Sequence, residues 1–413
     1  MTAVFSLSPV VDVAHPGVPV SAHLRTPLAY DVVAPLSNVL DALTLLSPDQ
    51  FGATFALCAV SFFGFWIYRH ARSRRGVSAR RLARAALVFI GGTVAVAGVG
   101  IVATRPMASL SLANRDLIAV DFHSHTDASH DGRPGFDAER NRAWHSSSGF
   151  DAVYITDHKT FDGALSGMAR NPPLSGDGTV LLPGVELRDG DEHPILIGVD
   201  PNRMRITSPD WQGAAVEADG GPTPPMLLLS MPGNILRIPS NEINGAVRLA
   251  GVEAADGSPR GMAQSARGRD AIMALAGKLH LALVSGSDNH GWGRTAPAWS
   301  VLRIPGWRDM TPGALDIAIR RTIITRGPQA IQVIARRTAP APHNKVETAL
   351  GGIMIATVMV RTMNFPDRLS WIAWSWGLCA LSLSGARRNR NRLRSRARQR
   401  MERTLRPVDA AAA

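Results

Sequence analysis

The stretch Leu117-Ile-Ala-Val-Asp-Phe-His-Ser-His125 joins a mainly apolar run directly to two histidines. A second stretch, Leu281-Ala-Leu-Val-Ser-Gly-Ser-Asp-Asn-His290, ends in the same way with an aspartate and a histidine. Side chains alternate between the two faces of a β-strand, so each His-x-His or Asp-x-His pair presents both side chains on one face. The spacing therefore predicts two strands that each end in a pair of metal-ligating residues.

Two more apolar runs end in acidic or histidine residues. Asp157 and His158 follow the run 152–155, and Glu186 follows the run 180–185. In parallel α/β barrels the catalytic residues gather at the carboxyl ends of the strands. Four such ends predict one metal site on a shared rim. The region has no cysteine and no Gly-x-Ser-x-Gly elbow, so a cysteine or serine nucleophile is disfavoured.

Apolar runs alternate with helical stretches from about residue 117 to residue 333. This pattern is typical of the α/β class, as a parallel barrel or an open sheet. Helices are expected at 270–278 and 312–326, and a surface loop at 209–225. The expected strands are 117–122, 152–155, 180–185, 195–199, 226–229, 279–284 and 301–304.

The net charge of +12 is concentrated in two segments. Seven arginines and no acid lie in 69–84, and ten arginines lie in 387–413, so the rest of the chain is close to neutral. A nucleic-acid-binding face would need a basic stripe on the main domain itself. We therefore expect no nucleic-acid partner and assign the arginines to membrane topology or to anionic lipid.

Two uncharged runs, 51–68 and 85–104, are long enough to cross a lipid bilayer. The arginine-rich loop between them should stay in the cytoplasm, because short basic loops are retained on that side. The segment after Thr104 is then expected to be extracytoplasmic or periplasmic. Cys58 and Cys379 both lie in apolar runs, so the central domain has no thiol to oxidise in such a compartment.

The flanking segments are expected to lie at the membrane as well. The run 34–46 is too short to span and contains Asp41, which favours an interfacial helix. Near the C-terminus, 369–385 is expected to cross once, with 348–360 at the surface or packed on the hairpin. If both cross, the chain has four spans instead of three, and ten arginines lie outside.

The motifs DFHSHTDASHDG (121–132), YITDHKT (154–160), LPGVELR (182–188) and SGSDNHG (285–291) resemble the PHP (polymerase and histidinol phosphatase) family of phosphoesterases. The resemblance covers about two fifths of the chain. It implies a distorted (β/α)7 TIM-like barrel that holds two or three divalent ions, commonly zinc, manganese or iron. The ligand positions that it implies are His123, His125, Asp131, His158, Glu186, Asp288 and His290.

Some positions depart from the family pattern. Met231 stands where the family usually has a histidine, which bears on the third ion. His193 is either a further ligand on the strand after Glu186 or a loop histidine. His145 and His280 are expected to be structural. With the barrel in place, the chain divides into an N-terminal segment (1–50), a transmembrane hairpin (51–104), a PHP-like domain (115–336), a C-terminal membrane region (345–386) and a basic tail (387–413).

The expected reaction is the attack of a metal-activated water on a phosphate ester. Two ions would share and acidify the water, while His158 or His290 assists the leaving group. Arg294, Arg188 and Arg133 lie close in sequence to ligand positions and could bind phosphate, and Arg294 is favoured.

The favoured function is a membrane-anchored, metal-dependent phosphoesterase with a phosphorylated substrate and the lipid bilayer as partners. Two alternatives stay open. One is a membrane-bound sensor or scaffold that binds metal or phosphate without turnover, and the other is a metal hydrolase for amide or ester bonds. The substrate can be a nucleotide, a sugar phosphate, a lipid phosphate or a cell-envelope polymer.

Overall fold

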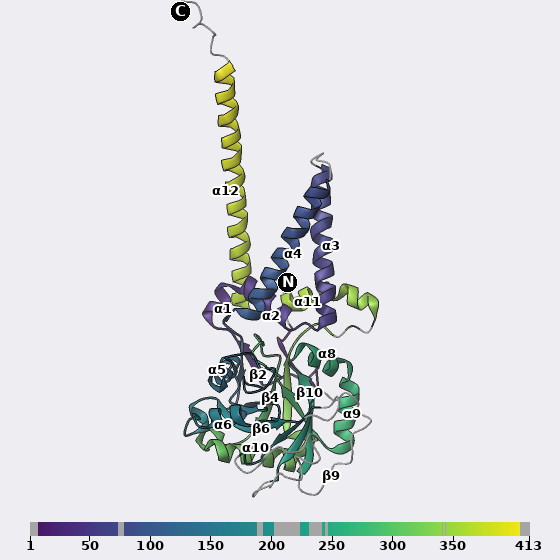
Figure 1. Ribbon diagram of the computed structural model, residues 1–413, viewed down its shortest axis with the longest axis vertical. Helices are drawn as coiled ribbons and strands as arrows, with labels where there is room; N and C mark the ends of the chain where they lie inside the picture. The colour runs from purple at the N-terminus through teal and green to yellow at the C-terminus, as the bar shows by residue number, and fades with distance from the viewer. Residues whose placement is uncertain are drawn as a thin grey trace, which may run out of the picture.

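The protein consists of a curled mixed sheet below a layer of helices, from which three long helices project (Figure 1). The computed structural model describes residues 7–72, 78–187, 193–201, 224–230, 242–243, 247–340, 342 and 344–404. The order of the main sheet is β1 (Val10–Asp12), β13 (Ile331–Arg336), β12 (Ala298–Arg303), β4 (Leu117–Ser124), β5 (Ala152–Ile155), β6 (Val180–Glu186), β7 (His193–Ile197), β8 (Met226–Ser230), β10 (Val247–Asp256) and β11 (Ala282–Gly286). β9 (Glu242–Ile243) pairs with β10, and β2 (Ala22–Arg25) pairs with β3 (Ser109–Leu112).

The sheet curls until its last strand, β11, returns to β4. Ser124 and Asn289 form a parallel bridge, and the backbone N–H of Asp288 donates to the carbonyl of His123 at 2.9 Å. The sheet thereby closes into a barrel-like shape. The α/β fold is confirmed, and each of the seven expected strands overlaps an observed strand. The strand expected at 279–284 begins later, at Ala282, because Leu279 still belongs to α9.

The strand directions differ in part from a parallel barrel. β4, β5 and β6 are parallel, as are β8, β10 and β11, but β7 and β12 run antiparallel to both of their neighbours. A parallel connection needs a crossover of a dozen or more residues. Only the short segment 187–192 separates β6 from β7, so the chain reverses direction there.

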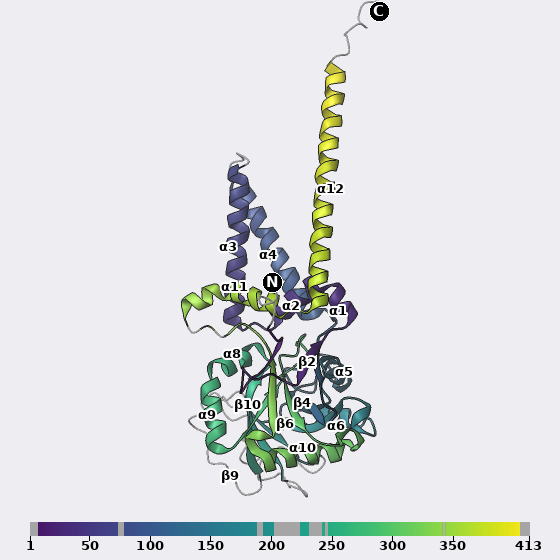
Figure 2. The same ribbon diagram turned by 180° about the vertical axis from the view of Figure 1, so that it is seen from behind.

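Helices cover the outside of the sheet (Figures 1 and 2). They are α5 (Ala138–Ser148), α6 (Asp162–Met168), α8 (Pro259–Arg267), α9 (Arg269–Leu279) and α10 (Pro312–Arg326), and the two helices expected here, 270–278 and 312–326, are confirmed. β5, β6 and β8 are buried along their whole length. Strands buried on both faces read as continuous apolar runs, which explains why these were visible in the sequence.

The helical layer contains α1 (Leu28–Val32), α2 (Ala34–Thr44) and α11 (Lys345–Thr362), and α3 (Pro48–Arg72), α4 (Ala79–Val102) and α12 (Phe365–Thr404) project from it. α3 and α4 are each long and apolar enough to cross a membrane. α11 and the first part of α12 (365–385) meet that criterion only as a pair, which is bent by 114°. α11 lies across the base of the hairpin and packs against α3 (Figure 2). Packing on the hairpin is one of the two arrangements expected for 348–360. The crossing expected at 369–385 lies in α12 and stays a prediction.

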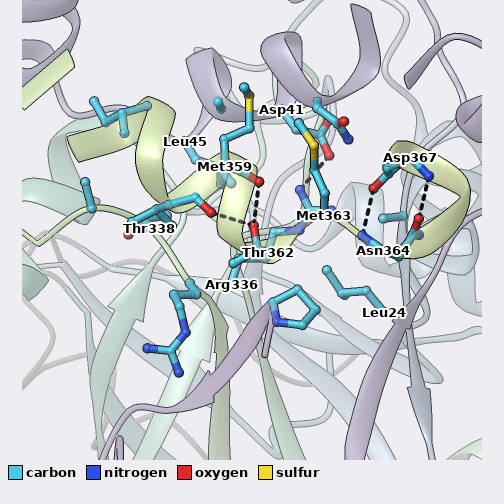
Figure 3. A pocket seen from close by; sticks show the side chains of 18 of the residues that line it. Leu24, Asp41, Leu45, Arg336, Thr338, Met359, Thr362, Met363, Asn364 and Asp367 are labelled. Atoms are coloured by element: carbon cyan, nitrogen blue, oxygen red, sulfur yellow. Dashed lines mark hydrogen bonds and ion pairs between the residues drawn. The ribbon is translucent and has the colours of Figure 1, made fainter. Parts of the chain in front are cut away.

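A buried ionic cluster joins the barrel to the helical layer. Asp41 of α2 forms ion pairs with Arg105 and with Arg336 of β13, the latter at 2.6 Å, and it accepts from Tyr30 and Thr295 at 3.0 Å each. Figure 3 shows Asp41 and Arg336 on the wall of a cavity of about 130 Å³ at this junction. Burial raises the pKa of Asp41, but the two guanidinium groups outweigh burial and hold this pKa below its usual value. The buried negative charge of Asp41 is therefore compensated within the chain.

Candidate metal centre

Four side chains from three strand ends converge on one point. His123 and His125 come from the end of β4, Glu186 from the end of β6, and Asp288 from the segment after β11. The Nε2 atoms of the two histidines lie 3.1 Å apart, and 3.2 and 3.1 Å from Glu186 Oε2. They lie 3.5 and 3.4 Å from Asp288 Oδ1. Ligand atoms at about 2.0–2.2 Å in a tetrahedron around zinc are about 3.4 Å from each other. The ligand atoms of His123, His125 and Asp288 all lie within 4.8 Å of one another, so these three fit one divalent ion, with Glu186 Oε2 beside both histidines.

The electrostatics of this first set also fit a cation. Burial lowers the pKa of His125, but contacts with Asp288 and Glu186 outweigh burial and raise it to about 9. Burial raises the pKa of Glu186, but His123 and the other histidines bring it well below its usual value. The buried carboxylates thus attract positive charge strongly. A divalent ion supplies that charge and leaves the imidazoles neutral, as ligation requires.

A second ligand set shares Glu186 with the first. His193 Nδ1 lies 2.5 Å from Glu186 Oε1, and His158 Nδ1 lies 3.4 Å from Glu186 Oε2. The three ligand atoms of His158, Glu186 and His193 lie within 4.8 Å of one another. The structure therefore brings His193, at the start of β7, to the site rather than into a remote loop. A carboxylate shared by two ligand sets is the arrangement of a bridged pair of ions.

A third group lies at the more open edge of the rim. Asp131 Oδ2 is 3.4 Å from His158 Nε2 and 3.3 Å from His290 Nε2, and the rings of His125 and His290 stack with centroids 3.9 Å apart. Asp131 therefore contacts both His158 and His290, whereas its neighbour His130 is exposed. Burial lowers the pKa of His158 to about 4, despite the opposing effect of Glu186. A neutral imidazole is the form that ligates. The ligand atoms of His125, His158 and His290 lie within 4.8 Å of one another, so the three could hold an ion.

The sequence did not reveal Ser230 and Glu253, which support His123 from behind. Ser230 Oγ lies 3.0 Å from His123 Nδ1 and donates to Glu253 Oε2 at 2.7 Å. This contact occupies Nδ1 and leaves Nε2 facing the other ligands.

Gly286 makes the close approach of Glu253 to His123 possible, since a Cβ at residue 286 would collide with both. Glu253 lies in β10, which was not expected as a strand. The signal that could have revealed Glu253 is a single carboxylate inside the otherwise uncharged run 249–255.

His145 has the structural role that was expected. It is fully buried, and its Nε2 lies 2.7 Å from Asp121 Oδ2. Asp121 Oδ1 accepts from the backbone N–H groups of Ser287 and His123 at 3.0 and 3.1 Å. This network holds the ends of β4 and β11 together beneath the ligands. His280 ends α9 in the left-handed conformation, away from the ligand sets.

The arginines expected to bind phosphate have other contacts. Arg294 Nε donates to the carbonyl of Ile101 in α4 at 2.8 Å, so its catalytic role stays a prediction without a contact to the ligand sets. The Arg133 guanidinium lies over the ring of Trp292 at 4.9 Å. Its backbone N–H donates to the carbonyl of His290 at 2.8 Å. Arg188, Met231 and most of the expected loop 209–225 lie outside the described residues.

The rim that carries the ligands faces the helical layer. Thr295, in the loop after His290, contacts Asp41 and Thr44 of α2 at 3.0 Å each. α8, which follows the carboxyl end of β10, forms an ion pair with α3 through Arg267 and Asp49. Figure 1 shows α8 between the sheet and α3. The end of the barrel that carries the candidate ligands is therefore the end from which the apolar hairpin projects.

Comparisons with known proteins give similarity to solved structures only. No protein-family model matches the chain, and no curated protein matches it either. PsfC from Pseudomonas syringae is 17% identical, with a TM-score of 0.35, over 60% of this chain and 99% of that chain. A two-domain protein from Bacteroides vulgatus, described as containing a predicted PHP-like metal-dependent phosphoesterase, is 18% identical, with a TM-score of 0.32, over 50% of this chain and 63% of that one. The lesion-specific endonuclease Q of Pyrococcus furiosus is 14% identical, with a TM-score of 0.38, over 52% of this chain and 57% of that one.

Proposed function

We propose that this chain is a membrane-anchored, metal-dependent phosphoesterase. The observation that carries the proposal is the shared carboxylate of Glu186. Its Oε2 contacts His123, His125 and His158, and its Oε1 contacts His193. Together with Asp288, Asp131 and the histidines, it forms a set of nitrogen and oxygen ligands typical of zinc, manganese or iron. Such a set suits hydrolysis of a phosphate ester, the reaction of the family that the sequence resembles.

Different residues of the chain have different roles in this reaction. Two or three divalent ions, when bound, supply Lewis acidity for a phosphate oxygen and lower the pKa of a water molecule. Glu186 and Asp288 provide the negative charge that holds them. Ser230 keeps His123 Nδ1 occupied and so fixes the ring orientation. Asp131, nearly half exposed, lies on the solvent side, where a substrate would enter.

Membrane anchoring is supported by the hairpin of α3 and α4. Their apolar side chains point outward, as for Val60 and Leu87, which are each 71% exposed. Burying such side chains in lipid removes apolar surface from water and is favourable. We infer that the hairpin crosses the bilayer, with its basic loop in the cytoplasm and the barrel on the opposite side.

Hydrolysis is tested with the full chain purified in detergent. After chelation, a phosphomonoester and a phosphodiester are each assayed with manganese and with zinc. We expect activity on at least one substrate that returns with metal. If metal binds at two or more ions per chain but neither substrate is cleaved, the sensor or scaffold function replaces the enzyme.

Topology is tested with reporter fusions. Alkaline phosphatase joined after Ser109 should be active, and a fluorescent protein that folds only in the cytoplasm should be dark at the same place. The opposite pattern would place the metal centre in the cytoplasm. A fusion after Arg400 should behave as cytoplasmic if 369–385 is the third and last crossing, and as external if four segments cross.

A further inference from the structure

A second cavity, distinct from the metal-ligand sets, lies between the barrel and the base of α4. Its volume is about 460 Å³. Its walls come from the segment that follows α4, the loop before α5, α5 itself and the loop after His290. The lining side chains that matter are Arg105, Arg133, Arg140, Arg294, Phe136 and Trp144. The cavity is thus both cationic and aromatic.

Three of the four arginines have no acidic partner among the residues that the structure describes. Arg140 donates to the carbonyl of Gly135 at 2.5 Å, Arg294 to that of Ile101 at 2.8 Å, and Arg133 to that of Gly291 at 3.4 Å. Arg105, by contrast, is paired with Asp41.

The arginines also act on one another. The four arginines line one cavity, and burial together with the charges of Arg133 and Arg105 lowers the pKa of Arg294. Clustered guanidinium groups without carboxylates favour an anionic ligand, and their planar forks match phosphate oxygens in bidentate fashion.

The cavity lies between the metal centre and the candidate membrane span. Gly291 directly follows the expected ligand His290, and the backbone of Arg133 donates to the His290 carbonyl. On the other side, Thr104 and Met107 of the lining follow α4 within a few residues. A molecule in the cavity would therefore lie next to both the ligand loops and the membrane surface.

We propose that this cavity binds the phosphate group of a membrane lipid, and that the substrate of the metal centre is a phosphorylated lipid. Arg133, Arg140 and Arg294 hold the phosphate, while Phe136, Trp144 and Met107 contact the first carbons of the acyl or isoprenoid chain. The inference rests on the proposed function for its catalytic half. Its binding half does not, because the arginines lie outside the metal-ligand sets.

Binding is measured on the metal-free full chain in detergent, so that hydrolysis cannot interfere. The probes are phosphatidic acid, phosphatidylcholine, glycerol 3-phosphate and inorganic phosphate. Phosphatidic acid should bind at least about tenfold more tightly than glycerol 3-phosphate, since only the lipid fills the apolar wall. The double variant R140Q/R294Q should lose about tenfold or more in phosphatidic acid affinity, because hydrogen bonds to charged groups are lost.

Matched controls separate binding from folding. Arg321→Gln, at an exposed position on α10, should leave lipid affinity unchanged. Arg140→Lys/Arg294→Lys keeps the charges but loses the forked geometry, and should show an intermediate loss. The thermal midpoint and metal content of all variants should match wild type, which excludes misfolding as the cause.

The outcomes are distinct. Unchanged lipid affinity in R140Q/R294Q overturns the assignment of the cavity. Equal affinity for inorganic phosphate and phosphatidic acid, both lost in that variant, means that the cavity takes phosphate from solution and overturns the lipid substrate. Arginine-dependent lipid binding without any hydrolysis by the metal-loaded chain removes the proposed phosphoesterase function while leaving the lipid-binding cavity in place.

Discussion

The protein buries charge in two neighbouring places, and the two clusters are compensated in opposite ways. Around Asp41, one carboxylate is surrounded by Arg105 and Arg336 and by two hydroxyl donors. In the metal centre, the carboxylates of Glu186 and Asp288 contact imidazoles and, among the described residues, no arginine or lysine. A buried charge is costly unless it is paired. The first cluster is complete without a ligand, whereas the second is completed by one.

This difference separates a structural cluster from a binding site. Thr295 connects the two, since it lies in the loop that follows His290 and donates to Asp41. Loss of a group in the Asp41 cluster should therefore affect stability first, and loss of a group in the metal centre should affect metal content and activity first. The following predictions test that separation.

The largest effect is expected for Asp288→Asn. The substitution removes a negative ligand oxygen that lies within 3.5 Å of both His123 and His125. We expect activity to fall by more than about 100-fold, beyond the range typical of residues that only support a ligand. Metal analysis should show the loss of at least one ion per chain. The control Asp309→Asn, at an exposed carboxylate, should change neither activity nor metal content. Wild-type metal content in Asp288→Asn would contradict the first ligand set.

Asp41→Asn should have the largest effect on stability. It leaves the buried guanidinium groups of Arg105 and Arg336 without a carboxylate. Breaking a buried pair in this way costs about 3–5 kcal/mol. Chemical unfolding of the full chain in detergent measures the loss. Asp49→Asn breaks an exposed pair with Arg267 and should cost less than about 1 kcal/mol; equal effects of the two variants would refute the compensated-cluster interpretation.

Metal removal should destabilise the wild-type chain. An ion at 100 times its dissociation constant stabilises the folded state by about 2.7 kcal/mol. Chelation should therefore lower the thermal midpoint of the wild type, and this shift should be smaller in Asp288→Asn. A chelator effect of the same size in both proteins would mean that the stabilising ion binds elsewhere.

Glu253→Gln should have a smaller effect. Glu253 supports His123 from behind: its Oε1 lies 3.6 Å from His123 Nδ1, and its Oε2 accepts from Ser230, which also contacts His123. Loss of such a supporting residue typically lowers metal affinity about 10–100-fold. Titration with zinc in a competing chelator measures this affinity. Glu139→Gln, in a partly exposed pair with Arg142, is the matched control and should bind metal as the wild type does.

The extent to which the sequence predicts this structure depends on the range of the interactions. His123 and Glu186 lie at the ends of buried strands, and Asp288 comes shortly after one, so a local pattern reveals both the strand and its candidate ligand. Glu253 was missed because β10 contains Arg248, Gly251 and several alanines and does not form a continuous apolar run. The Asp41 cluster could not be predicted, because Arg105 and Arg336 are 64 and 295 residues away along the chain. No spacing rule connects such distant positions.

The closure between β4 and β11 has a consequence for solubility. β11 is the last strand of its sheet, and a strand edge with free N–H and C=O groups is a template for pairing with other chains. Here Ser300 accepts from the backbone of Ser285, and the segment of Asp288 and Asn289 bonds to His123, Ser124 and His125. The residues that gather the candidate metal ligands thus also cover part of this edge, which leaves fewer free N–H and C=O groups there for pairing with another chain.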